Sequence, residues 1–197
     1  MKLPFYFITI LMCGCSSLKA TYLEKVSAGT LINRSLYLVS VPQQSPEDKR
    51  KWERYSKDGK SDDLILKSSE GMVLPSYAAT IQVTKKLIGV ATVNDLKEHA
   101  AKDQNYMKFA TSKEMQEIEK PQEFLLCIKP AFHLDAAPER PVGFFWHRMA
   151  CIDSKTHNYY EINLSYMTKR NGNTPPENLE ILAESFFASF SVKDYSK

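Results

Sequence analysis

The clearest alternation of hydrophobic and polar residues lies late in the chain. Residues 143–152 and 158–168 are rich in aromatic and other strand-forming side chains, and five polar residues, 153–157, separate the two runs. A strand points alternate residues to opposite faces. In the second run, one face therefore carries Tyr160, Ile162, Leu164 and Tyr166, and the other carries Glu161, Asn163 and Ser165. The pattern predicts a long β-hairpin with one buried and one solvated face.

Further strands are predicted where short apolar or alternating runs are bounded by turn residues. These runs are residues 36–41, 64–67, 77–87 and 124–129. The run 77–87 alternates between apolar and polar positions, which is typical of a strand in a half-solvated sheet. Residues 130–141 contain three prolines and are predicted to form a loop.

Two helices are predicted from apolar residues three positions apart. Ser45 and Pro46 suit the N-cap and the first helical position of a helix over residues 45–58, in which Trp52 and Tyr55 share the inner face. A second, short helix is expected to begin at residue 111 or 112. It would carry two apolar residues, Met115 and Ile118.

Two more helices have clearer boundaries, at residues 92–103 and 176–190. The first begins with a capping sequence, Thr92 to Asp95, and the second follows another at residues 174–177. Apolar residues at spacings of three and four predict the inner face of the second helix, namely Leu179, Leu182, Phe186 and Phe190. Helices mixed with consecutive antiparallel strands predict an α+β fold, with one antiparallel sheet packed against helices and an amphipathic helix at the C-terminus.

The order of these elements resembles that of the PsbP-like α/β/α sandwich proteins, which include small envelope lipoproteins. The resemblance rests on an N-terminal strand, a charged region, a late hairpin and a terminal helix that contains AESFFASF at residues 183–190. It implies a non-enzymatic accessory or binding domain. A likeness of fold does not by itself assign a function.

The N-terminus has the pattern of a bacterial lipoprotein precursor. Lys2 precedes an apolar run over residues 3–12. This run is about half of the ~20 residues that a membrane-spanning helix needs, and it is typical of a signal-peptide core. The sequence LMCGC ending at residue 15 resembles the lipobox, in which a small residue precedes the lipidated cysteine. Gly14 fits the small position and Cys15 the lipidated one, whereas Met12 and Cys13 depart from the usual residues.

The lipobox resemblance implies a division of the chain and a location. Residues 1–14 would be the signal peptide, 15–30 a tether and 31–197 a single α+β domain. Ser16 directly after the lipid site implies sorting to the outer membrane, facing the periplasm, in a cell with two membranes. An ordinary cleaved signal peptide, with incidental cysteines, is the alternative.

Cys127 and Cys151 remain once the two N-terminal cysteines are set aside. An even pair in an oxidising compartment favours a disulfide, and pairing of strand 124–129 with strand 143–152 would bring the two residues together. Such a bridge contributes about 3 kcal/mol to stability in the chain-entropy model. Two buried free thiols are the alternative.

Composition and charge narrow the classes of partner. The chain is 43% hydrophobic and 25% charged with a formal charge of +3, which is typical of a globular domain and supplies no basic field for nucleic acid. The predicted partners are therefore a membrane, through the lipid, and an envelope protein or a small apolar ligand. No nucleic-acid partner and no cofactor are predicted.

The sequence contains no motif that is diagnostic of catalysis. His133 and Asp135 share the predicted loop 130–141, and His147 lies on the strand that follows it. Together they are the candidate metal ligands or acid–base groups. An aromatic concentration on the late hairpin fits either a packed core or a binding groove. We therefore expect a lipid-anchored envelope protein with a non-catalytic binding or accessory domain. The alternative is a lipid-anchored hydrolase or metal-dependent enzyme that uses these three residues.

Overall fold

The structure is a computed structural model of the whole chain. It describes residues 22–43, 51–56, 63–68, 76–103, 114–120, 122–130, 134–135, 142–169 and 178–194. The predicted signal peptide, the lipid site Cys15, His133 and the capping residues expected near positions 45, 111 and 174 lie outside the described residues.

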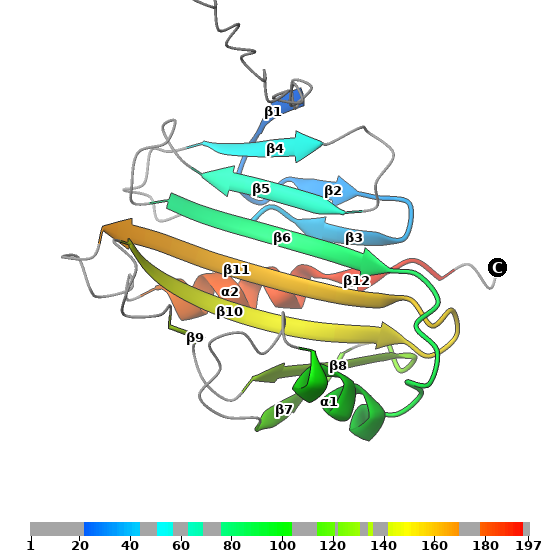
Figure 1. Cartoon of the computed structure of the whole chain (residues 1–197). Helices are drawn as coiled ribbons and strands as arrows, with labels where there is room; N and C mark the ends of the chain where they lie inside the picture. The colour runs from blue at the N-terminus through cyan, green and yellow to red at the C-terminus, as the bar shows by residue number, and fades with distance from the viewer. Residues whose placement is uncertain are drawn as a thin grey trace, which may run out of the picture.

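A large antiparallel sheet dominates the described residues (Figure 1). Eight strands follow one another in the order β1-β4-β5-β6-β11-β10-β8-β7, and the short β9 pairs with one end of β10. Their bounds are Tyr22–Val26 for β1, Trp52–Ser56 for β4, Leu64–Ser68 for β5, Ser76–Thr84 for β6, Met115–Ile118 for β7, Leu125–Pro130 for β8, Leu134–Asp135 for β9, Val142–Asp153 for β10 and Tyr159–Lys169 for β11.

The predicted hairpin is confirmed and forms the centre of this sheet. β10 and β11 pair over eleven residue pairs, and β6 pairs with the other edge of β11. The alternation predicted for β11 is also confirmed, because Tyr160, Ile162, Leu164 and Tyr166 are all buried. The long strands thus present one apolar and one polar face across three neighbouring strands.

A helix and a small second sheet cover the apolar face. The helix α2 (Leu179–Ser189) contacts β3, β10 and β11. The small sheet has the order β12-β3-β2, with β2 at Leu31–Asn33, β3 at Tyr37–Ser40 and β12 at Ser191–Val192. The predicted inner face of α2 is confirmed, since Leu179, Leu182 and Phe186 are buried, as is Phe190 just beyond the helix.

On the opposite face, the helix α1 (Val93–Lys102) covers the region near β8 and β10. Leu96 and Ala100 of this helix pack on Ile128, Ala150 and Ile152 in a second apolar cluster. The predicted capping box is confirmed: the Asp95 amide donates to Thr92 Oγ1 at 3.1 Å, and the Thr92 amide donates to Asp95 Oδ2 at 2.9 Å. In Figure 1, α1 lies beside β7 and β8, whereas α2 lies behind β10 and β11.

The expected α+β fold, with one sheet packed against helices, is wrong. The structure is mostly β: its described residues form twelve strands and two helices. Two segments that were predicted as helical are strands, namely the second half of residues 45–58 and the segment from 115 to 118. These two segments form β4, which lies between β1 and β5, and β7, which lies at the opposite edge of the sheet.

A spacing of three residues caused both errors. In a helix, such a spacing puts two side chains on one face, but in a strand it puts them on opposite faces. Met115 packs with the α1 cluster and Ile118 with the main core, so β7 presents one apolar residue to each side of the sheet. Trp52 is buried in the main core while Tyr55 is only partly buried.

The strand β1 extends the domain into the range 15–30 that the sequence assigned to a tether. Residues Tyr22–Val26 pair with β4 along the edge of the large sheet. Val26 packs against the main core, which gives this strand an apolar anchor. The sheet therefore includes the residues Tyr22–Val26.

Cys127 and Cys151 form a disulfide in the structure, the pair expected from the sequence. The two residues lie directly opposite each other on β8 and β10, with their Cα atoms 4.1 Å apart. Both side chains are buried in the main core. The bridge therefore joins β8 to the central hairpin on the apolar face of the sheet.

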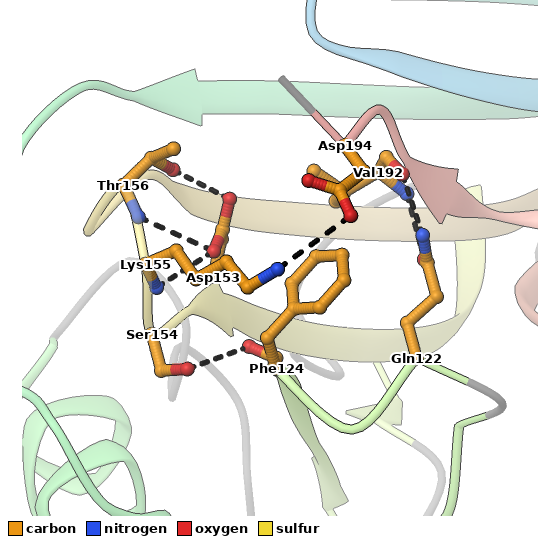
Figure 2. A network of polar contacts seen from close by, with 8 residues as sticks. All are labelled: Gln122, Phe124, Asp153, Ser154, Lys155, Thr156, Val192 and Asp194. Carbon is orange, nitrogen blue, oxygen red and sulfur yellow. Dashed lines mark hydrogen bonds and ion pairs between the residues drawn. The ribbon is translucent and has the colours of Figure 1, made fainter. Parts of the chain in front are cut away.

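The turn between β10 and β11 is held by the buried carboxylate of Asp153 (Figure 2). Its oxygens accept hydrogen bonds from the Lys155 amide at 2.9 Å and from the Thr156 hydroxyl at 2.6 Å. The Ser154 hydroxyl donates to the Phe124 carbonyl at 3.1 Å, which ties the turn to the start of β8. These contacts fix the end of the hairpin that carries the disulfide.

Candidate ligand-binding hollow on the open face of the sheet

The polar face of the central strands forms an open hollow of about 780 Å³ beside α1. This volume falls in the range of small-molecule pockets, about 300–1,000 Å³. Strands β6, β10 and β11 supply most of the floor, and α1 supplies one side. The lining residues are Thr80, Gln82, Thr84, Leu87, His99, Asp103, Trp146, Arg148, Tyr159, Glu161, Asn163 and Ser165.

Strand register explains why these residues meet. Thr80 lies opposite Asn163, and Asn163 lies opposite Arg148 on the next strand. Residues directly opposite one another in adjacent strands have their side chains on the same face. The alternation that buries the apolar residues of β6 and β11 therefore gathers their polar neighbours into rows on the other face. Helix α1 closes one end of these rows with His99 and Asp103.

Arg148 and Trp146 form a pair within the hollow. The guanidinium carbon lies 4.7 Å from the centre of the indole ring, in the geometry of a cation–π contact. Arg148 also attracts the charge of Glu161. The guanidinium therefore packs on the indole ring and is attracted to a carboxyl group on the neighbouring strand β11.

Burial raises the pKa of the Glu161 carboxyl, even though Arg148 and a hydrogen bond from Asn163 oppose this shift. Asn163 Nδ2 donates to Glu161 Oε1 at 3.4 Å and to Thr80 Oγ1 at 3.4 Å. Nearby Asp103 raises the pKa further. The charged form of Glu161 is therefore held at an energetic cost, which is a property found often at functional sites.

Buried polar atoms of Tyr159 and Asn163 at the hollow have no hydrogen-bond partner among the described residues. They are the phenolic oxygen of Tyr159 and Oδ1 of Asn163. Tyr159 is only 4% exposed, and the ring of His99 meets its ring edge-on at 5.3 Å. Burial, followed by Glu161 and Asp103, raises the pKa of the Tyr159 hydroxyl, so it stays protonated. A buried polar atom that makes no hydrogen bond lowers the stability of the fold. A ligand could supply the missing hydrogen bond to each of these two atoms.

Of the predicted enzyme site, the structure describes Asp135 and His147. His147 is on β10 with its neighbours Phe145 and Met149, which pack on the main core, so it is on the face opposite the hollow. The pairing of β9 with β10 places Asp135 opposite Phe145, two residues from His147. With His133 outside the described residues, the predicted trio remains a prediction. Among the residues that the structure describes, no cluster of three or more His, Cys, Asp or Glu side chains is arranged to hold a metal ion.

The aromatic concentration predicted on the hairpin divides between the two faces. Tyr37, Tyr160 and Tyr166 belong to the main core, where Tyr37 and Tyr160 pack edge-to-face at 6.1 Å. Trp146 and Tyr159 instead face the hollow. The packed-core interpretation is therefore confirmed for Tyr37, Tyr160 and Tyr166, while a binding groove at Trp146 and Tyr159 stays a prediction.

Sequence reasoning placed Glu161, Asn163 and Ser165 on the solvated face, yet it did not identify them as a site. Arg148 and Gln82 were also missed. The available signal was the polar face of each of the strands β6 and β11, together with Trp146 and Arg148 two positions apart on β10. That signal can be used only when the pairing of the strands is known.

Comparison with known proteins adds no relative. A scan against protein-family models and a search of curated proteins both found no match. Within the described residues, neither helix has the length and apolar character needed to cross a bilayer.

Proposed function

We propose that this protein is a lipid-anchored protein of the bacterial cell envelope whose domain binds a polar ligand on the open face of its large sheet. The anchor is Cys15, and the location is the outer membrane facing the periplasm. The domain acts by binding rather than by catalysis. A cleft with convergent polar groups and perturbed pKa values is the default position for a ligand site.

The observation that carries this proposal is the state of the side chains in the hollow. Burial disfavours the charged form of Glu161, and Tyr159 and Asn163 each bury a polar atom without a partner among the described residues. These features lower the stability of the free fold, so the hollow is poorly explained as ordinary protein surface. A bound ligand would supply the missing partners.

Two further observations support the envelope location. The Cys127–Cys151 disulfide suits an oxidising compartment. The lipobox-like sequence at Cys15 provides the route to the membrane. A single acyl chain anchors weakly, and a diacylated cysteine holds a protein on the bilayer.

A thermal-shift screen of the full-length protein in detergent tests the binding proposal. The compounds would cover neutral saccharides, amino acids, short peptides, organic phosphates and fatty acids. We expect at least one class to raise the Tm of the wild type, because a ligand at 100 times its Kd stabilises the folded state by about 2.7 kcal/mol. The variant Trp146→Ala should lose the shift.

Lys67→Ala is the matched control. Lys67 lies on the same face of the sheet, because it is paired with Ala78, which is paired with Ser165, but it is exposed and outside the hollow. This variant should respond as the wild type does. A screen without any stabilising class, or a shift that Trp146→Ala retains, would contradict the proposal.

A further inference from the structure

The hydrogen-bonding groups of the hollow are numerous and varied. All the lining residues except Leu87 carry a side-chain atom that can donate or accept a hydrogen bond. Several of them are planar groups with two such atoms, namely Gln82, Arg148, Glu161 and Asn163. A lining of this kind suits a ligand with many hydroxyl groups and disfavours an acyl chain.

The hollow carries charged groups of both signs, one guanidinium and two carboxyl groups. Arg148 is the cation of the lining, and its attraction is directed at Glu161. Asp103 adds a second carboxylate at the end near α1. A phosphorylated or carboxylated ligand would meet these two carboxylates, and a strongly cationic ligand would meet the guanidinium. An uncharged ligand avoids both repulsions.

The unpartnered atoms of Tyr159 and Asn163 need a ligand that offers both a hydrogen-bond donor and a hydrogen-bond acceptor. Asn163 Oδ1 can only accept, whereas the hydroxyl of Tyr159 can donate. A sugar hydroxyl donates and accepts, so a ligand made of such groups satisfies either atom. Trp146 lies at the other end of the hollow, with the Arg148 guanidinium against its indole ring, and one face of a sugar ring presents mainly C–H groups that pack on an indole.

We propose that the ligand of this hollow is a neutral saccharide, bound through Asn163 and Tyr159 and packed against Trp146. This inference rests on the proposed function and specifies the class of its ligand. Hydroxyl groups of the sugar fill the hydrogen-bonding positions of β6 and β11.

Tryptophan fluorescence offers a direct test, because the chain has only two tryptophans. Trp52 is 1% exposed in the main core, so a ligand-dependent change reports on Trp146. The full-length protein, in a detergent without a sugar headgroup, would be titrated with maltotriose, cellotriose and tri-N-acetylchitotriose at millimolar concentrations. Dodecanoate, tetra-alanine and phosphoserine are the comparison probes.

We expect at least one trisaccharide to change the emission of the wild type, with no change in Trp146→Phe, where Trp52 remains. Calorimetry would then measure affinity in Tyr159→Phe and Asn163→Ala. Each should weaken binding by about fivefold, the effect of losing one ordinary hydrogen bond.

Matched controls separate these effects from damage to the fold. Tyr166→Phe removes a hydroxyl on the same strand but on the opposite face, and Gln116→Ala removes an exposed amide on β7. Both should bind as the wild type does. Equal losses in the variants and in their controls would overturn the assignment of the site.

The outcomes distinguish this inference from the proposed function. If no trisaccharide binds while another compound class binds in a Trp146-dependent way, the saccharide inference is wrong and the binding function stands. If no class binds the hollow at all, both are wrong.

Discussion

Loss of the Cys127–Cys151 disulfide should destabilise the protein by an amount that follows from its position. The bridged residues are 24 positions apart. In the chain-entropy model, closing a loop of this size removes enough freedom from the unfolded chain to contribute about 3 kcal/mol. With a urea m-value of about 2 kcal/mol/M, reduction should lower the unfolding midpoint by roughly 1.5 M.

The local effect should be unevenly distributed. β8 pairs with β10 over only four residue pairs, whereas β10 pairs with β11 over eleven. Reduction should therefore loosen β8 and its outer neighbour β7 before the central hairpin opens. Hydrogen exchange in the reduced protein should rise first in residues 115–130 and last in β10 and β11.

The assay is urea unfolding of the wild type and of Cys127→Ala/Cys151→Ala, each with and without reductant. Reductant should shift the midpoint of the wild type and leave that of the double variant unchanged. A shift of less than about 0.5 M in the wild type would refute the reasoning, because the unfolded chain would then gain little freedom from reduction.

Three further changes probe the charged groups. Burial raises the pKa of Glu161 above its ordinary value of 4.5. Between 4.5 and the raised pKa, the native state binds more protons than the unfolded chain, so the free energy of unfolding falls as the pH rises. Glu161→Gln should remove this fall and raise the Tm at neutral pH, which calorimetry at several pH values would show; an unchanged pH profile would contradict it. Burial lowers the pKa of Lys120 from 10.5 to about 8, so the unfolded chain binds more protons between these values and stability should rise with pH from about 8 to 10.5. Urea unfolding should show this rise in the wild type and not in Lys120→Met, and a matching rise in the variant would count against burial of the ammonium as its cause. Asp153→Ala removes the acceptor for the turn amides and should destabilise by about 2 kcal/mol, whereas Asp153→Asn, which keeps one acceptor oxygen, should lose less; equal losses in urea unfolding would show that the carboxylate does not act through these bonds.

The sequence was most informative where a periodic pattern was long. The hairpin, the alternating strand β6 and the inner face of α2 each have a run of apolar positions long enough to distinguish a strand from a helix. The capping residues of α1, Thr92 and Asp95, were informative for a different reason. Their two reciprocal hydrogen bonds are local, so no tertiary contact is needed to predict them.

Short segments were predicted wrongly because tertiary pairing decided their structure. β4 is five residues long and lies between β1 and β5, and β7 is four residues long on an edge. Two apolar residues three positions apart fit a helix or a strand equally well. The local pattern does not show that these segments pair with other strands. Fewer strands were therefore predicted than the structure contains.

The candidate site was hidden from the sequence for a related reason. Arg148, Glu161 and Gln82 come from three strands and meet only through their register. Each of them alone is an ordinary polar residue on a solvated face. The disulfide was predicted because the two cysteines lie in strands that follow one another along the chain, 124–129 and 143–152, and such strands often pair.

The central claim, an anchored domain that holds a ligand in the open hollow, is tested most directly by native mass spectrometry of the full-length protein gently extracted from its own membranes. We predict a chain that begins at Cys15 with added acyl mass, and a bound small molecule on the wild type that is lost in Trp146→Ala. An unacylated chain, with the same bound species or none on both proteins, would contradict the account.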